Sequence, residues 1–321
     1  MNPLVSILIP VYNREKIVGD TIQSAINQTY TNIEIIIVDN CSTDGTWAVL
    51  EDYQKKDSRI LIFRNEKNVG PVRNWGISFE KASGEFGKII YSDDTIESTF
   101  LEQSVPFLKN KEIAFVFTSV KLGKSLNSFK ISYETYNDTQ IYSSQSFIKN
   151  ALYRENAPVS PGCALFRLKD LKKNLQFEIP SPSLKDFYLH GAGNDLLLFL
   201  ITAHEYPSVA FIKRPLVFFR DHKNSISIQT NRRYLFDCYI QAKVFFVENY
   251  LTKDDSCKLY LHIWYQYVRE YKRKVMPKIL LKKYTNQFDG FTLKSVIEFL
   301  RFKITFKSLI IFLKIRLKIK F

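Results

Sequence analysis

Short apolar runs alternate with segments of helical periodicity through the first 95 residues, and this alternation limits the possible folds more than any other feature. The apolar runs have strand length and lie at Val5–Ile9, Ile33–Val38, Ile60–Phe63 and Phe86–Tyr91. The helical segments lie between them, at 15–28, 46–55 and 71–82. Such alternation predicts βαβ units and a parallel sheet with helices on both faces. Pro10 is expected to end the first strand.

The rest of the chain continues this pattern and then becomes helical. Further strands are expected at 113–120, 163–166 and 209–219, and a helix at 194–204. The polar segment 121–142 is expected to be a hairpin or a mobile loop. After Arg232 the spacing of apolar residues predicts two long helices, at 234–249 and 253–274. We therefore expect an α/β domain over 1–228 and a helical region over 229–321.

Composition excludes several classes of protein. An apolar content of 45% with 11 Gly and 11 Pro in 321 residues excludes disorder over most of the chain. The longest apolar runs are too short for a polytopic membrane protein. Met1–Pro10 carries no basic residue before its apolar run and is interpreted as a strand, not a signal peptide. Four widely spaced cysteines without a CxxC pair disfavour a zinc site or disulfides and fit a reducing cytoplasm.

Polar residues follow each of the four apolar runs. These segments are 10–13, 39–45, 64–73 and 92–94. In an open parallel sheet, ligands bind beyond the carboxyl ends of the strands, so we expect these segments to form one site.

The adjacent acids Asp93 and Asp94 are the most informative pair in these segments. Two neighbouring carboxylates after a buried strand repel each other unless a cation neutralises them. Carboxylate oxygens suit Mg²⁺ or Mn²⁺, and Mg²⁺ is commonly held by one or two carboxylates together with substrate phosphates. The alternative is that the pair forms a solvated turn or a helix cap.

Five ordered blocks give the chain a family resemblance. They are VSILIPVYN (5–13), QTYTNIEIIIVDN (28–40), STDGT (42–46), NVGPVRN (68–74) and YSDD (91–94). In this order they resemble the family 2 glycosyltransferases, which have the GT-A fold and transfer a sugar from a nucleotide sugar. The resemblance implies a Rossmann-like mixed sheet, with a nucleotide-sugar-binding half over 1–98 and an acceptor-side half over 99–228. It is strong over the first 100 residues and looser to about Ser227.

The resemblance also implies a role for individual residues. The nucleotide-sugar-binding residues would be Pro10, Tyr12, Asn13, Asp39, Asn40, Arg73, Asp93, Arg220 and His222. Asp94 and Asp93 would hold the Mn²⁺ or Mg²⁺ that bridges the donor phosphates. The segment with Arg220, His222 and Ser225 would close over the diphosphate, or it is a surface loop.

Asp195 matches the position of the family's general base, at the start of an apolar helix. It would accept a proton from the acceptor hydroxyl during a single displacement that inverts the anomeric configuration. The alternative for Asp195 is a helix N-cap, and Asp186 is the second candidate for the base.

Two positions depart from the family pattern. Asn40 stands where a second acidic residue is common, and an amide accepts a pyrimidine N–H only through its carbonyl oxygen. UDP, dTDP and GDP donors therefore all stay open. Tyr91 stands at the first position of the usual Asp-X-Asp metal motif.

Positive charge is concentrated at the C-terminus. Residues 270–321 hold 14 basic and three acidic residues, an excess of +11 out of +14 for the whole chain. From Leu293 onward, apolar and basic residues recur at helical spacing, which predicts a basic amphipathic helix drawn to anionic lipid. A core-packed helix or a helix of a homodimer interface are the alternatives. Nucleic-acid binding is disfavoured because the body is nearly neutral and lacks an aromatic platform.

Together these features predict an enzyme. We expect an inverting, metal-assisted glycosyltransferase bound peripherally to the cytoplasmic face of a bacterial plasma membrane. Its acceptor would be a lipid-linked oligosaccharide or a glycolipid of lipopolysaccharide or capsule synthesis. The alternatives are a nucleotidyltransferase with a similar fold, although VYNREK (11–16) is not a Gly-rich phosphate loop, and a non-catalytic membrane scaffold.

Overall fold

The structure is a computed structural model that describes residues 2–154, 157–182, 187–223, 225, 230–271 and 276–291. The chain divides into two compact units. The first comprises Met1–Ile179 and Asp186–Ala242, and the second comprises Pro180–Lys185 and Lys243–Phe321. The candidate site described below lies in the first unit.

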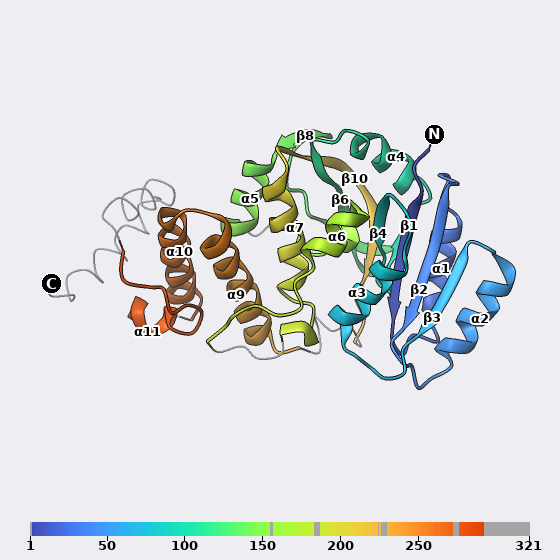
Figure 1. Ribbon diagram of the computed structural model, residues 1–321, viewed down its shortest axis with the longest axis horizontal. Coiled ribbons are helices and arrows are strands. Elements are labelled where there is room, and N and C mark those ends of the chain that lie inside the picture. Colours follow the sequence, from blue (N-terminus) through green and yellow to red (C-terminus); the bar gives the residue numbers. More distant parts are fainter. Residues whose placement is uncertain are drawn as a thin grey trace. The chain divides into compact units, whose positions relative to one another are not determined.

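The N-terminal part of the first unit alternates strands and helices, which confirms the expected βαβ pattern (Figure 1). The elements are β1 (Val5–Val11), α1 (Val18–Ile26), β2 (Ile33–Asp39), α2 (Thr46–Lys56), β3 (Ile60–Arg64), α3 (Pro71–Lys81) and β4 (Phe86–Ile89). β1 lies between β2 and β4, and all four strands are parallel. α3 lies on one face of β1 and β2, with α1 and α2 on the other (Figure 1).

Pro10 does not end β1, contrary to our expectation. The β1–β2 ladder continues to the Val11–Asp39 pair, whereas the β1–β4 ladder stops at Leu8–Ile89. The reason is that a proline has no N–H to donate, and the N–H of residue 10 would face β4. The chain after β4 is thereby released from the sheet just before Asp93 and Asp94.

The second half of this unit adds both parallel and antiparallel strands to the sheet. Its elements are β5 (Thr95–Ile96), α4 (Phe100–Leu108), β6 (Ile113–Ser125), β7 (Ser128–Ser132), β8 (Gln140–Ser143), α5 (Ser144–Tyr153), β9 (Ala164–Arg167), α6 (Leu168–Asn174), α7 (Asn194–Glu205) and β10 (Ser208–Arg220), with short 3-10 turns at Pro161–Cys163 and Phe187–Leu189. Within the described residues the sheet has ten strands, in the order β3-β2-β1-β4-β9-β6-β10-β5, with β7 beside β6 and β8 beside β10. β9 is antiparallel to both of its neighbours, so the sheet is mixed as expected.

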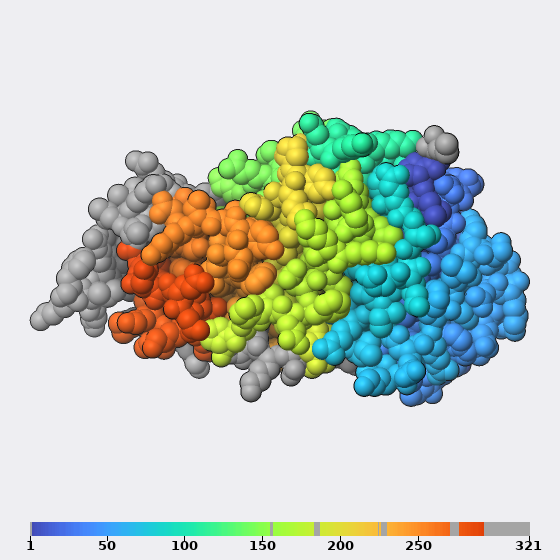
Figure 2. Space-filling view, viewed as in Figure 1, coloured from blue at the N-terminus to red at the C-terminus, as the bar shows by residue number. Residues whose placement is uncertain are grey.

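Aromatic side chains fill the core between this sheet and its helices. Phe115 on β6 packs against Phe147 of α5 and Phe199 of α7, with ring centroids 5.0 Å apart in each pair. Edge-to-face pairs of this kind add stabilisation beyond their buried area. α7 is buried almost all round, which explains its nearly continuous apolar sequence. α3 and α6 contact each other, and their surfaces adjoin in the space-filling view (Figure 2).

The segment 121–142 is a hairpin only as far as Ser132, because Gln140–Ser143 forms a separate strand, β8, that pairs with β10. β6 extends to Ser125, turns, and returns as β7. At Gly123 an added Cβ would lie 2.1 Å from the Ser128 carbonyl oxygen, so this close pairing requires glycine.

The second unit is helical where it is described. α9 (Arg232–Tyr250) runs into it from the first unit and is followed by α10 (Lys253–Tyr271) and α11 (Pro277–Leu281). Glu248 accepts hydrogen bonds from the hydroxyls of Tyr260 and Thr285, which ties these segments together. In the described part of the chain, no helix combines the length and apolarity needed to cross a bilayer. The expected basic amphipathic helix falls at 293–321, outside the described residues.

Candidate functional site

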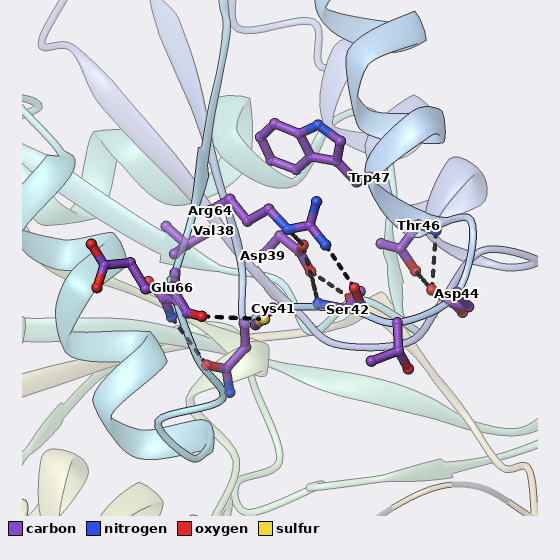
Figure 3. A network of polar contacts seen from close by, with 12 residues as sticks. Val38, Asp39, Cys41, Ser42, Asp44, Thr46, Trp47, Arg64 and Glu66 are labelled. Carbon is purple, nitrogen blue, oxygen red and sulfur yellow. Dashed lines mark hydrogen bonds and ion pairs between the residues drawn. The ribbon is translucent and has the colours of Figure 1, made fainter.

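The turn after β2 is organised by a fully buried carboxylate, Asp39 (Figure 3). Its oxygens accept hydrogen bonds from the backbone N–H and the hydroxyl of Ser42. The Nε atom of Arg64, at the end of β3, lies 3.3 Å from Asp39 Oδ2, and Arg64 also donates to the Ser42 carbonyl at 2.8 Å. The guanidinium lies over the Trp47 ring. Asp39 therefore fixes the turn; Ser42 is buried with it, and the Arg64 side chain is the exposed part of this network.

Asn40 links this turn to the loop before α3. Its carbonyl oxygen accepts from Asn65 Nδ2 at 3.0 Å and from the Val69 N–H at 2.9 Å, and its amide donates to Asn68 Oδ1 at 2.8 Å. The side chain is buried. Both lone pairs of the carbonyl oxygen are thus engaged within the protein.

The segment after β1 lies against the same turn. The Asn13 N–H donates to Ser42 Oγ at 2.9 Å, and Asn13 Oδ1 accepts from the Thr43 N–H at 2.8 Å. Asn13 has a φ of 51°, a conformation that asparagine adopts more readily than most residues. Pro10 is buried behind it, whereas Tyr12 is 39% exposed and presents its ring at the edge of the sheet.

Asp93 and Asp94 follow β4, where a turn forms with the Asp94 N–H donating to the Tyr91 carbonyl. The end of β10 reaches this turn although it is about 125 residues away in the sequence. The Arg220 N–H donates to Asp94 Oδ1 at 2.9 Å, and Arg220 Nε donates to the Asp93 carbonyl at 3.1 Å. His222 Nε2 lies 2.8 Å from Asp93 Oδ2, and Arg14 Nη2 lies 3.8 Å from the same oxygen.

Asp94 is a carboxylate held in unfavourable surroundings. It is only 7% exposed, and burial together with the neighbouring Asp93 raises its pKa well above the usual range for aspartate. A divalent cation would favour the ionised form by neutralising both carboxylates. Among the described residues, no three His, Cys, Asp or Glu side chains converge as a metal site. The pair thus fits a metal held by two carboxylates and completed by ligand phosphates.

Lys88, on β4, is fully buried. Its ammonium donates to the Gly162 carbonyl and lies 4.1 Å from the centroid of the Phe100 ring. Burial lowers the pKa of Lys88 to about 7, against the opposing effects of Cys163 and Asp94. We did not predict this residue, although a lysine inside the apolar run FGKII is a signal that the sequence offers.

Asp195 lies in the first turn of α7 and is 9% exposed. Its Oδ1 accepts from the N–H groups of Gly193 and Leu196 at 2.8 and 2.7 Å, and its Oδ2 accepts from the Tyr239 hydroxyl at 2.9 Å. Burial raises the pKa of Asp195 to about 7, and these hydrogen bonds oppose the rise. Gly193, not Asp195, occupies the N-cap position, although Asp195 Oδ1 accepts N–H groups at the start of the helix.

Tyr91 is near both Asp94 and Asp195. Both Asp195 and Asp94 act electrostatically to raise the pKa of its hydroxyl, after the larger effect of burial. Its ring packs on Trp75 of α3 with centroids 5.5 Å apart. An added Cβ on Gly162 would lie 3.3 Å from the same ring.

The remaining predicted residues are placed as follows. Arg73 extends towards another loop, with its guanidinium 4.0 Å from the centre of the Tyr188 ring and 3.8 Å from Glu178 Oε1. Ser225 donates to the His222 carbonyl at 2.6 Å and so supports the segment after β10. Asp186, the second candidate for the base, lies outside the described residues.

Besides Lys88, three residues near these carboxylates were not predicted: Arg14, Tyr133 and Tyr239. Arg14 immediately follows the VYN block, which was the available signal. Tyr133 and Tyr239 come from the hairpin and from α9, and nothing in the local sequence distinguishes them from other tyrosines. Tyr133 has a φ of 62°, a strained value for an aromatic residue that often marks functional sites.

Comparison with known proteins assigns this arrangement to a family. The model of glycosyl transferase family 2 matches residues 6–175, more than half of the chain. The chain belongs to glycosyltransferase family 2. This membership confirms the resemblance carried by the five sequence blocks, all of which lie within the matched residues except Val5.

Two bacterial relatives illustrate the family. The chain is 37% identical over 142 residues to TuaG of Bacillus subtilis, named as a teichuronic acid biosynthesis glycosyltransferase, covering 42% of this chain and 56% of TuaG. It is 34% identical over 121 residues to an Escherichia coli enzyme, UDP-Glc:alpha-D-GlcNAc-diphosphoundecaprenol beta-1,3-glucosyltransferase WfaP, covering 38% of this chain and 47% of WfaP. The chain thus spans about half the length of these curated relatives.

Solved structures confirm the GT-A fold of this family 2 member. S. aureus TarS 1–349 in complex with UDP-GlcNAc superposes with a TM-score of 0.65 at 17% identity, over 92% of this chain and 80% of TarS 1–349. The mannosyltransferase PcManGT from Pyrobaculum calidifontis in complex with GDP-Man and Mn²⁺ superposes with a TM-score of 0.52 at 15% identity, over 88% of this chain and 79% of that protein.

Proposed function

We propose that this protein transfers a sugar from a nucleoside diphosphate sugar to the hydroxyl of an acceptor, with inversion at the anomeric carbon. One observation supports this above all. A pair of carboxylates suited to a metal–diphosphate complex lies after β4, and a further buried carboxylate, Asp195, is near enough for both Asp94 and Asp195 to raise the pKa of Tyr91. A metal-binding pair and a separate candidate base suit donor and acceptor.

The donor would lie along the carboxyl ends of β1, β2 and β4. Tyr12 and Asn13 would flank the nucleoside, with Arg64 and Ser42 above the buried Asp39. Asp94 and Asp93 would hold Mn²⁺ or Mg²⁺, which would stabilise the negative charge that develops on the leaving diphosphate. Arg14, Arg220 and His222 would surround the same phosphates, because all three already contact Asp93 or Asp94. Arg73 would lie at the rim of the nucleoside pocket, and its side chain would have to leave Tyr188 and Glu178 to reach the nucleoside.

The reaction would be one displacement. The acceptor oxygen forms a bond to the anomeric carbon while the bond from that carbon to the diphosphate oxygen breaks, and the electron pair leaves with the diphosphate. The acceptor proton passes to Asp195, whose pKa of about 7 suits a base near neutral pH. Asp195 Oδ1 is occupied by two backbone N–H groups, so Oδ2 is the atom with a free lone pair for this proton.

UDP-, dTDP- and GDP-sugars are all candidate donors. Asn40 can accept a base N–H only by giving up one of its two internal hydrogen bonds. Its second amide hydrogen remains for a base carbonyl. TarS, which shares the fold, binds UDP-GlcNAc, and PcManGT binds GDP-Man with Mn²⁺.

The acceptor and the location follow from the relatives and from the charge of the chain. WfaP acts on a sugar linked to diphosphoundecaprenol, a lipid carrier. A lipid-linked oligosaccharide or glycolipid of bacterial polysaccharide synthesis is therefore the proposed acceptor. The +11 excess over 270–321 would hold the protein peripherally at the anionic inner face of the plasma membrane. The alternative role of this region is homodimerisation.

Turnover of nucleotide sugars tests this proposal. Purified protein is incubated with UDP-, dTDP- and GDP-sugars and Mn²⁺, and the released nucleoside diphosphate is measured. We expect Asp94→Ala to lower turnover at least about 100-fold, because it removes a charge that contributes several kcal/mol through the metal. Asp52→Ala, at an exposed site on α2, is the matched control and should retain wild-type turnover.

Removal of metal gives the complementary result. Turnover should cease in EDTA and return when Mn²⁺ or Mg²⁺ is added in excess. Unchanged turnover in Asp94→Ala, or full turnover in EDTA, would reject the metal role assigned to this pair.

A further inference from the structure

Tyr239, on α9, forms a hydrogen bond with Asp195 in the first turn of α7. It lies on α9, in the part of that helix that belongs to the first unit. Its hydroxyl donates to Asp195 Oδ2 at 2.9 Å. No feature of the sequence marks this tyrosine, and the family model ends at residue 175, well before it.

The two carboxylate oxygens of Asp195 have different hydrogen-bond partners. Oδ1 accepts two backbone N–H groups that come from the first turn of α7 and the residue before it. A carboxylate oxygen has two lone-pair positions, so Oδ1 is filled. Oδ2 accepts one hydrogen bond, from Tyr239, and keeps one position for a proton donor.

We infer that Tyr239 is a positioning residue, which orients Asp195 and stabilises its charged form so that Oδ2 can accept the acceptor's proton. This inference rests on the proposed role of Asp195 as the base. A hydrogen bond to a carboxylate stabilises the ionised form selectively, because the protonated form is a poorer acceptor. Tyr239 therefore opposes the effect of burial, which favours the neutral form of Asp195.

Among the described residues, the other titratable groups near Asp195 do not supply this stabilisation. Tyr91 after β4, Tyr133 after β7 and Cys238 on α9 each have a pKa raised in part by the charge of Asp195. Each is therefore neutral near pH 7 and brings no positive charge. The same charge also raises the pKa of Tyr239, so its hydroxyl stays protonated and remains a donor throughout the working range of pH.

The pH profile of transfer tests this inference. In Tyr239→Phe the carboxylate loses one charge-assisted hydrogen bond, so the acid limb of kcat/KM should move up by about one pH unit. Transfer should fall up to about tenfold below pH 6 and change little above pH 8.5. A purely structural role for Tyr239 would lower the rate by the same factor at every pH and would leave the limb in place.

A matched control is available in the same unit. The Tyr206 hydroxyl donates to Asp170 Oδ2 at 2.8 Å, so Tyr206→Phe removes the same kind of hydrogen bond away from Asp195. It should lower the melting temperature comparably and leave the acid limb unchanged. An acid limb at the same pH in wild type and Tyr239→Phe, or an equal shift in Tyr206→Phe, would overturn the inference.

A second variant covers the case in which Tyr239→Phe does not fold. Site-specific incorporation of 3-fluorotyrosine at 239 keeps the packing and makes the hydroxyl a stronger donor, so the acid limb should move to lower pH. A shift to higher pH or no shift would contradict the role. Failure of the proposed function would be recognised separately, because Asp195→Asn would then retain wild-type transfer.

Discussion

The environment of Asp195 favours its neutral form, although the proposed chemistry needs its charged form. Burial raises the pKa of this group from 3.8 to about 7, and three hydrogen bonds oppose the rise. Asp94 is similarly disfavoured by burial and by Asp93. Buried carboxylates that lack a full complement of partners lower the stability of the native state, and such groups concentrate at functional sites.

This cost gives the first prediction at the residue scale. Because the folded pKa of Asp195 lies above the unfolded value, its ionisation lowers stability progressively as pH rises from about 4 to about 7, and the loss is complete above that range. Asp195→Asn removes the ionisation, and the Tyr239 hydroxyl can accept from the new amide. We expect the variant to be more stable than wild type by about 2–4 kcal/mol at pH 8.

Urea unfolding at pH 8 and pH 5 measures this difference. The gain should be smaller at pH 5, where wild-type Asp195 is largely protonated. If the difference in unfolding free energy between Asp195→Asn and wild type were the same at pH 8 and pH 5, burial would not disfavour the charge of Asp195. Transfer in the same variant should be lost while donor binding persists.

At the scale of elements, the site is built from strand ends and the loops that connect them. The segments that follow β1 and β2 are hydrogen-bonded to each other, and Asn40 attaches the loop before α3 to them. The Asp93–Asp94 turn is held by β10, which approaches from the other half of the sheet. Each functional segment is therefore fixed by an element distant in the sequence.

Asn40 allows a test at this scale. Asn40→Ala would leave the Asn65 amide and the Val69 N–H without their acceptor in a buried position, so we expect a loss of about 2–4 kcal/mol in unfolding free energy. Asn32→Ala, at an exposed side chain that donates one hydrogen bond to the Asn2 carbonyl, is the control. Its cost should stay within about 0.5 kcal/mol. Equal costs in urea titrations would contradict the structural role of Asn40.

The first half of the chain was more predictable than the second. Strands such as β2 are almost continuously apolar because both faces are covered, and the polar residues after them mark the candidate ligand edge. Lys88 was predictable in principle, since a charged side chain inside such a strand must be neutralised or paired. Tyr239 was not predicted, and for Arg220 the role was predicted but the contact with Asp94 was not, because tertiary contacts across the fold set these partners and local sequence patterns do not show them.

At the scale of the whole molecule, charge is divided unevenly. The first 269 residues are close to neutral, and the excess lies in the last 52. The proposed catalytic region and the proposed membrane-binding region therefore occupy different parts of the chain. Membrane attachment and donor turnover should be separable by truncation.

Vesicle binding tests this separation. Residues 291–321 hold eight basic residues, each worth about 1 kcal/mol near an anionic surface before salt screening. Deletion of 292–321 should weaken binding to phosphatidylglycerol vesicles at least tenfold and leave donor hydrolysis unchanged. Wild-type binding should weaken at about 0.5 M salt and be slight on phosphatidylcholine vesicles. Full binding after the deletion would assign the attachment to another part of the chain.

The metal–diphosphate position is the centre of this account, and one measurement tests it directly. A crystal of the protein with Mn²⁺ and a nucleotide sugar, measured at the manganese absorption edge, locates the ion by its anomalous signal. We predict a single strong peak within coordination distance of a carboxylate oxygen of Asp94 or Asp93, bridged to both donor phosphates. A diphosphate bound elsewhere, with no manganese beside these two aspartates, would contradict the account.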